Sequence, residues 1–176
     1  NMSLLDGGLH AWKRESVRIE KGKKKKFKKT KFKFEGEEDK SLFANKDMVE
    51  SNVGTSLMLV DCRSDDEFAG VEMKKGAFRA GHIPGAVQAD YHNCINMKPE
   101  SKNFCNLKSK KKLRELYASK GIEENDSLII YCHSGVRSAH STFVLTQVLG
   151  FKNVKNYDGS WIEWSYFEEL PIEKEE

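Results

Sequence analysis

The residues SLIIYCHSGVRS, numbered 127–138, lay out a strand, a loop and the start of a helix in one short run. The first half is apolar and β-branched, which predicts a buried strand that ends at Cys132. In that layout, backbone N–H groups of the loop and the positive end of the helix dipole converge on the Cys132 sulfur. This environment, with Arg137 nearby, favours the reactive thiolate at neutral pH. Cys132 is therefore a candidate nucleophile.

The spacing within this loop distinguishes between two kinds of cysteine chemistry, phosphate-ester hydrolysis and sulfur transfer. Arg137 follows Cys132 by five positions, whereas the Cys-x5-Arg loop of cysteine-dependent phosphatases places its arginine six positions on. A loop one residue shorter makes a smaller anion cradle, suited to a sulfur atom carried on the cysteine. The competing interpretation of the isolated motif is an inert, buried cysteine at a strand end, which is common for free cysteines.

Three segments in chain order resemble the signatures of rhodaneses, the sulfurtransferases. They are LVDCRSDDEFAG at 59–70 followed by AGHIPGAV at 80–87, the loop at 127–138, and YDGSWIEW at 157–164. The chain resembles the C-terminal, catalytic domain of two-domain thiosulfate and 3-mercaptopyruvate sulfurtransferases.

The apolar runs predict an α/β fold. Four predicted strands alternate with four predicted helices, which indicates a parallel sheet flanked by helices on both faces, as the resemblance to rhodaneses also implies. Ligands of such folds bind at the carboxyl ends of the strands, where Cys132 would lie. The predicted strands are 57–60, 86–89, 127–131 and 154–157, and the predicted helices are 45–52, 109–119, 138–149 and 160–168.

Several residues within the signatures have structural interpretations. Asp61 and Arg63 are expected to pair with each other, because charged groups near a core persist when they are paired. His82 lies in a turn-rich segment and is expected to be a hydrogen-bonded turn residue. Trp161 and Trp164, three positions apart on a predicted helix, are expected to be core or interface anchors.

An internal repeat divides the chain. DGGLHAW at 6–12 has the same Asp-Gly-small and Trp spacing as DGSWIEW at 158–164. We interpret 1–19 as the tail of a preceding rhodanese-like domain, 20–40 as a Lys-rich linker and 41–176 as the catalytic rhodanese domain. The alternative is a coincidence between two short glycine turns. On the first interpretation, the side chains of Leu4, Leu5, Leu9 and Trp12 should dock on a hydrophobic surface near the mouth of the Cys132 loop.

The formal net charge of +3 hides an uneven distribution. Residues 21–33 contain nine lysines and no acid, so the remainder carries −6. This lysine-rich segment could be a nuclear localisation signal or could contact a nucleic acid. We favour a solvated linker that wraps the domain and is pinned by Phe27, Phe32 and Phe34, because the chain lacks any nucleic-acid motif. We therefore expect no nucleic-acid partner.

The cysteines and the hydropathy pattern limit the classes of protein to which the chain can belong. Cys62, Cys94, Cys105 and Cys132 form no Cys-x-x-Cys pair and have no histidine at metal-ligand spacing, so neither a metal site nor a disulfide scaffold is expected. No apolar run is long enough for a membrane span, and no signal peptide is recognisable. We expect a cytoplasmic protein without a membrane partner, in a compartment that keeps thiols reduced.

The resemblance implies a thiosulfate sulfurtransferase that works through a persulfide on Cys132 and needs no other cofactor. Its partners would be a small-molecule sulfur donor, a thiophilic acceptor (cyanide or a thiol) and the missing N-terminal rhodanese domain. Arg137 would hold the anionic donor, backbone N–H groups of the loop would stabilise the persulfide, and Gly135 would relieve crowding. Lys75 and Arg79 fall where two-domain family members place a basic residue for the donor. The predicted substrate-binding residues are His133, Ser134, Gly135, Val136, Arg137, Lys75 and Arg79.

Other functions remain open. A 3-mercaptopyruvate sulfurtransferase is one, although many such enzymes have an arginine where this chain has Glu67. The charged Cys132 loop also favours thiosulfate over 3-mercaptopyruvate as the sulfur donor. A phosphatase is disfavoured by the short loop, and a non-catalytic docking module is disfavoured by the presence of Cys132.

Overall fold

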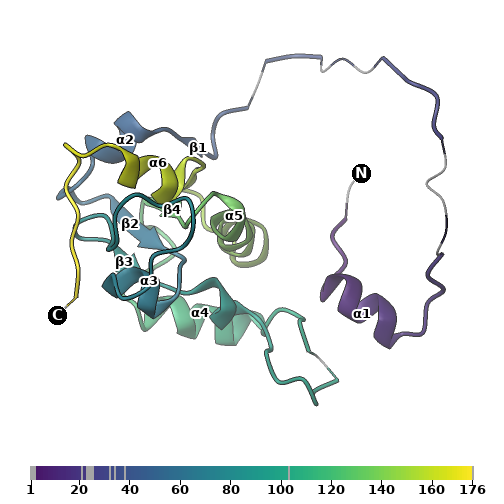
Figure 1. Ribbon diagram of the computed structural model, residues 1–176. Coiled ribbons are helices and arrows are strands. Elements are labelled where there is room, and N and C mark those ends of the chain that lie inside the picture. The colour runs from purple at the N-terminus through teal and green to yellow at the C-terminus, as the bar shows by residue number, and fades with distance from the viewer. Residues whose placement is uncertain are drawn as a thin grey trace.

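A parallel five-stranded sheet forms the centre of the protein (Figure 1). The computed structural model describes residues 3–20, 22, 26–31, 33, 35–37, 39–102 and 104–175. The strands are β1 (Phe43–Ala44), β2 (Met58–Asp61), β3 (Val87–Gln88), β4 (Leu128–Tyr131) and β5 (Val154–Tyr157). Their order across the sheet is β1-β5-β4-β2-β3, and every pairing is parallel. The fully buried strand β4 is therefore in the middle of the sheet, and it carries Cys132 at its carboxyl end.

Helices cover both faces of this sheet. One face packs against side chains from η1, α4 and η2, and the other packs against α2 and α6. The α/β prediction is therefore confirmed. The helices are α1 (Gly8–Arg14), α2 (Lys46–Glu50), α3 (Asp65–Ala69), η1 (Tyr91–Cys94), α4 (Lys110–Ala118), α5 (Val136–Phe143), η2 (Val144–Leu149) and α6 (Ser160–Tyr166).

The predicted elements recur with small shifts, and the elements that sequence patterns missed are short. Strand β1 has two residues, and α3 has five residues that follow the N-cap Ser64. Elements of this length carry too few residues to show a hydrophobic period. The helix predicted at 138–149 begins earlier, at Val136, and continues as a π-helical segment over 144–149.

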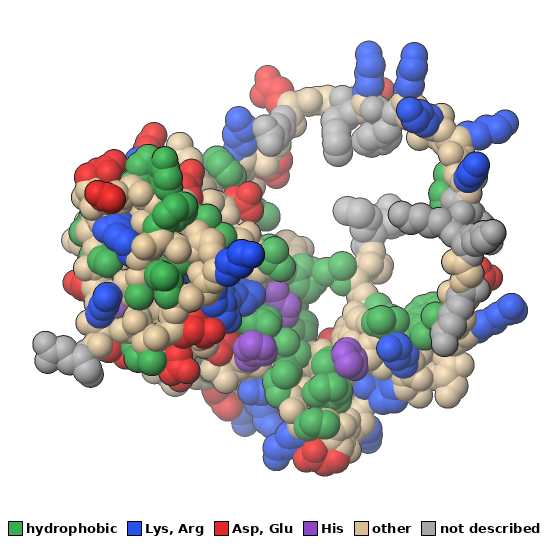
Figure 2. Space-filling model, in the orientation of Figure 1, with side chains coloured by type: hydrophobic (Ala, Val, Ile, Leu, Met, Phe, Trp, Pro, Cys, Tyr) green, Lys and Arg blue, Asp and Glu red, His purple; other side chains and the backbone are tan. Residues whose placement is uncertain are grey.

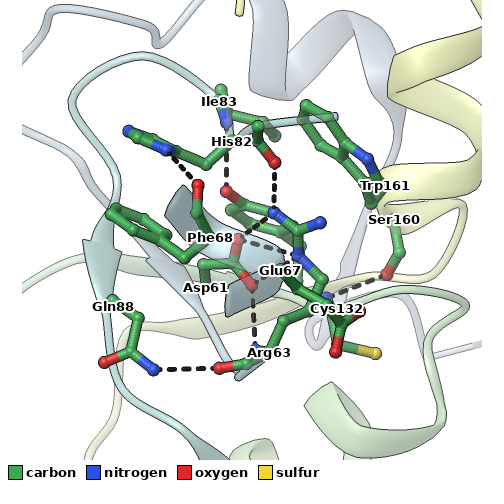
Figure 3. Close-up of polar contacts among 12 residues, drawn as sticks. Asp61, Arg63, Glu67, Phe68, His82, Ile83, Gln88, Cys132, Ser160 and Trp161 are labelled. Atoms are coloured by element: carbon green, nitrogen blue, oxygen red, sulfur yellow. Dashed lines mark hydrogen bonds and ion pairs between the residues drawn. The ribbon is translucent and has the colours of Figure 1, made fainter. Parts of the chain in front are cut away.

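The structural interpretations of the signature residues are confirmed. Arg63 and Asp61 are 2% and 0% exposed, and Nη2 of Arg63 lies 2.6 Å from Oδ2 of Asp61. Nδ1 of His82 lies 2.8 Å from the carbonyl oxygen of Phe68, and the two rings are stacked. Trp161 and Trp164 are both buried in the core. Figure 3 shows the Asp61–Arg63 pair between Trp161 and His82.

The N-terminal segment is held mainly through polar contacts. The carboxylate of Asp6 accepts hydrogen bonds from Nδ2 of Asn106 and from the backbone N–H of Leu107. Arg14 donates to the carbonyl oxygen of Phe104. Because these contacts engage the polar edge of α1, the apolar residues of the segment gain little cover.

The expectation that the four apolar side chains of this segment would be buried is therefore wrong. Leu4, Leu5, Leu9 and Trp12 are 75%, 55%, 61% and 41% exposed. Leu4 and Leu5 do line a cavity of about 250 Å³, to which His140 and Phe143 of α5 also contribute.

The segment between α1 and β1 arcs away from the domain (Figure 1). Phe27 is 84% exposed, so the prediction that the linker wraps the domain is wrong at this residue. Phe32 and Phe34 lie outside the described residues. Figure 2 shows the lysines of the arc projecting outward, which fits a solvated linker.

No helix within the described ranges is long and apolar enough to cross a membrane. The same part of the chain contains no group of three or more His, Cys, Asp or Glu residues that could hold a metal ion.

Candidate active site

Cys132 lies directly after β4 and before the turn that leads into α5. The residue is 0% exposed and belongs to the core cluster on the α4 and η2 face of the sheet. The strand, loop and helix start predicted from the sequence are therefore present, and the helix begins immediately after Gly135.

The first turn of α6 binds the carbonyl groups of the Cys132 loop. The backbone N–H of Trp161 donates to the carbonyl oxygen of Cys132 at 2.9 Å, and that of Ile162 donates to His133 at 3.0 Å. The first N–H groups of a helix have no partner within the helix and are free to make such bonds. These two bonds attach the start of the Cys132 loop to α6.

Ser160 ties the two ends of this loop together. Its buried Oγ accepts hydrogen bonds from the backbone N–H of Cys132 at 3.2 Å and of Gly135 at 3.1 Å, and it donates to the carbonyl oxygen of Tyr157 at 2.7 Å. Figure 3 shows this hydroxyl beside the Cys132 backbone. Ser160 has a φ of 54°, a left-handed conformation that is costly for a residue with a Cβ. Ser160 lies within the signature at 157–164, but the sequence pattern did not indicate this role.

Position 135 requires a glycine, because its backbone conformation and its neighbours leave no room for a side chain. Its φ is 82°, and a Cβ at this position would lie 2.5 Å from Oδ1 of Asp158. The prediction that Gly135 relieves crowding in the loop is therefore confirmed in geometry. Its N–H, however, is already bound to Ser160, so this group is not free to stabilise a charge on Cys132.

The environment of Cys132 favours the thiolate. Burial by itself raises the pKa of the thiol, but hydrogen bonds from the Ser138 side chain and from the backbone N–H groups of Ser138 and Ser134 outweigh burial. The positive charge of Arg137 acts in the same direction, and the pKa of Cys132 lies below the ordinary value. The Ser138 hydroxyl also lies 2.9 Å from the carbonyl oxygen of Gly135, so it is shared between two acceptors.

A cluster of charges adjoins the loop. Both terminal nitrogens of Arg137 bind the carboxylate of Glu67, which is 1% exposed and also accepts an ion pair from Lys74 at 2.9 Å. Lys74 also lies 4.0 Å from Glu72, and Arg137 is the cation of this cluster whose charge acts on Cys132. From the sequence alone, Arg137 was expected to bind the donor, and Glu67 stood out only as a departure from 3-mercaptopyruvate enzymes. The acid in the signature DDEF was the signal that could have revealed the pair.

The structure brings Lys75 to the loop but not Arg79. Nε2 of His133 lies 3.2 Å from the carbonyl oxygen of Lys75, whose side chain is exposed. The Arg79 guanidinium binds backbone carbonyl groups at the C-terminal end of α6, including Phe167 at 2.6 Å. The Cys132 loop is bound at the opposite end of that helix. Of the other predicted residues, Val136 is 75% exposed at the start of α5, and Ser134 contributes its backbone N–H.

Comparison with known proteins agrees with this geometry. Residues 44–166 match the rhodanese-like domain family, and the chain belongs to this family. It is 37% identical over 179 residues to a protein of Saccharopolyspora erythraea named "Putative thiosulfate sulfurtransferase". This match covers 98% of this chain and 60% of that protein. It is 39% identical over 123 residues to the thiosulfate sulfurtransferase of Corynebacterium glutamicum, which covers 66% of this chain and 38% of that protein.

A solved structure of EanB in complex with ergothioneine shares the fold. The TM-score is 0.83 at 25% sequence identity, over 98% of this chain and 41% of that one. The chain thus spans about 60% or less of the length of these relatives.

Proposed function

We propose that the protein transfers sulfane sulfur from thiosulfate to cyanide or a thiol acceptor through a persulfide on Cys132. The observation that carries this proposal is the cradle around the thiol, in which N–H groups of Ser134 and Ser138 lower its pKa. The names of the relatives and the family support the same reaction class.

In the first half-reaction, the Cys132 thiolate attacks the outer sulfur of thiosulfate. A new S–S bond forms to Cys132, the S–S bond of thiosulfate breaks, and sulfite leaves with the electron pair. The persulfide keeps one negative charge, and the N–H groups of Ser134 and Ser138 are in place to stabilise it.

In the second half-reaction, cyanide or a thiolate attacks the outer sulfur of the persulfide. Thiocyanate, or the persulfide of the acceptor, leaves, and the Cys132 thiolate is restored. This is a double displacement, as expected for covalent catalysis.

The charges around the loop suit an anionic donor. The positive charge of Arg137 acts on Cys132, and the exposed Lys75 adds a cation to the segment that contacts the loop through His133. Glu67 holds Arg137 in place, so Arg137 acts through its charge on the loop. Cys132 is 0% exposed, so the loop must move before the donor can reach the sulfur.

Mass spectrometry after treatment with thiosulfate tests the proposal. Trypsin should release residues 121–137, which contain Cys132, and this peptide should gain the mass of one sulfur. Subsequent cyanide should remove the sulfur and yield thiocyanate. The Cys132→Ser variant should gain no sulfur, whereas Cys105→Ser should behave as the original protein does.

Other outcomes would redirect the assignment. Loading by 3-mercaptopyruvate but not by thiosulfate would identify the other donor. A Cys132 peptide that gains no sulfur from either donor would contradict the proposal and favour a docking module.

A further inference from the structure

A second cysteine lies opposite Cys132 in the sheet. Cys62 follows β2 as Cys132 follows β4, and the register of these two strands pairs Asp61 with Tyr131. The backbone N–H of Cys62 donates to the carbonyl oxygen of Tyr131 at 2.8 Å, which is the parallel-ladder bond that continues this register by one residue. Cys62 and Cys132 are therefore directly opposite neighbours.

The two thiols also face the same side of the sheet. Cys62 and Cys132 share one core cluster with Val60 and Ile130, two residues before each of them, whereas Tyr131 belongs to the cluster on the other face. Neighbouring strands lie about 4.8 Å apart. Disulfides form at Cα separations of about 4.4–6.8 Å, so these positions are within range.

The remaining cysteines have different surroundings. Sγ of Cys94 lies 3.4 Å from the hydroxyl of Tyr117, and Cys105 lies in the partly exposed 95–107 loop. Neither of them follows a strand of the sheet. Cys62 is thus the cysteine that the sheet register places beside the nucleophile, and the sulfur-transfer reaction leaves it unused.

We propose that Cys62 is a resolving cysteine that forms a reversible disulfide with Cys132 when the protein meets hydrogen peroxide. The Cys132 thiolate attacks one peroxide oxygen, the O–O bond breaks, and hydroxide leaves, so that Cys132 becomes a sulfenic acid. The Cys62 sulfur, giving up its proton, then attacks the Cys132 sulfur and displaces the hydroxyl group as water. Two thiols lose two electrons and one peroxide gains them, which yields one disulfide and two waters.

The electrostatics of the pair set the order of these steps. Burial, followed by the charges of Asp61 and Cys132, raises the pKa of the Cys62 thiol, while that of Cys132 is lowered. Cys132 is therefore the more readily deprotonated, and so the more reactive, of the two thiols. The disulfide would protect Cys132 from further oxidation to the irreversible sulfinic and sulfonic acids.

Peptide mapping tests this inference without any assay of sulfur transfer. The protein is treated with peroxide, its remaining thiols are blocked with N-ethylmaleimide, and it is digested with trypsin without reduction. We expect residues 47–63 linked to 121–137, with the loss of two hydrogens, and dithiothreitol should separate the two peptides.

The matched variants are Cys62→Ala and Cys94→Ala, which each remove one buried thiol from the same core cluster. Cys62→Ala should drive Cys132 to the sulfinic and sulfonic acids, with loss of the dithiothreitol-reversible fraction, whereas Cys94→Ala should keep the linked peptides. Finding Cys132 in the original protein as a free thiol, as a sulfinic acid, or linked to Cys94, Cys105 or another molecule would overturn the proposal. This mapping on the original protein decides the matter even if Cys62→Ala fails to fold.

Discussion

Both terminal nitrogens of Arg137 bind the carboxylate of Glu67, with Nη1–Oε2 at 2.6 Å and Nη2–Oε1 at 2.8 Å. The arginine lies in the first turn of α5, after the Cys132 loop, and the glutamate lies on the short helix α3. The pair therefore joins two segments that each contain a rhodanese signature, and it fixes a positive charge beside the thiol.

Arg137→Ala should destabilise the fold, because it removes the main partner of a carboxylate that is 1% exposed. We expect a loss of about 3 kcal/mol in the free energy of unfolding, at the low end for a broken buried pair because Lys74 still contacts Glu67. Urea denaturation measures this change. Lys111→Ala, which removes an 86% exposed side chain, should change stability by no more than about 0.5 kcal/mol. Equal effects of the two variants would show that the Arg137–Glu67 pair contributes little.

Stability should fall in acid partly through Glu67. Burial raises the pKa of this carboxyl, but Arg137 and Lys74 more than compensate and lower it from 4.5 to about 2. The depressed pKa means that the ionised pair contributes fully above the unfolded value and is lost as pH falls from 4.5 toward about 2. Glu67→Gln should be less stable at neutral pH and should lose less stability over this range. Urea midpoints at several pH values would show this, with the exposed Glu115→Gln as control; parallel acid curves for Glu67→Gln and the original protein would contradict it.

Ser160→Ala should impair sulfur transfer more than its effect on stability predicts. It leaves the N–H groups of Cys132 and Gly135 without their acceptor, at a cost of about 1–3 kcal/mol for each buried group. Misplacement of the loop should lower kcat by up to about a hundredfold. The control is Ser165→Ala, on the same helix, whose buried hydroxyl accepts from Phe78 instead. Ser165→Ala should lose a similar amount of stability but keep its kcat. If Ser160→Ala also keeps its kcat, the hydroxyl of Ser160 does not position the loop.

Ser138→Ala should shift the pH dependence of persulfide formation to higher pH. The hydroxyl of Ser138 is one of the groups that overcome burial and lower the pKa of Cys132. Without it the pKa rises, the thiolate fraction at a given acidic pH falls, and the acid limb of the rate profile moves upward in pH. Pre-steady-state loading with thiosulfate across pH measures the limb. Ser141→Ala, a buried serine on the same helix, should leave it in place; an unmoved limb in Ser138→Ala would show that backbone N–H groups alone set this pKa.

Much of the fold followed from local patterns. The apolar runs at 57–60, 127–131 and 154–157 predicted β2, β4 and β5 within one residue, because central parallel strands are buried on both faces and read as continuous apolar segments. The position of Cys132 between a strand and a helix followed from the same pattern. The buried Asp61–Arg63 pair was also predictable, since its members are two residues apart and a buried charge needs a partner.

The functional partners of Cys132 depend on contacts between distant parts of the chain. Ser160 reaches the loop because α6 is placed over it, and Glu67 reaches Arg137 from a helix that follows a different strand. The exposure of Leu4 and Trp12 was likewise invisible in the sequence, because the position of α1 depends on polar contacts of Asp6 with Asn106 and Leu107.

The sequence by itself determined the strand–cysteine–loop–helix unit and its family signatures, because periodicity, turn residues and motif spacing act over a few neighbouring residues. Only the tertiary structure decided that Arg137 is held by Glu67, that Ser160 binds the loop and that Cys62 lies opposite Cys132. These relationships follow from the parallel strand order and register, which bring together the carboxyl ends of strands that are far apart in the chain.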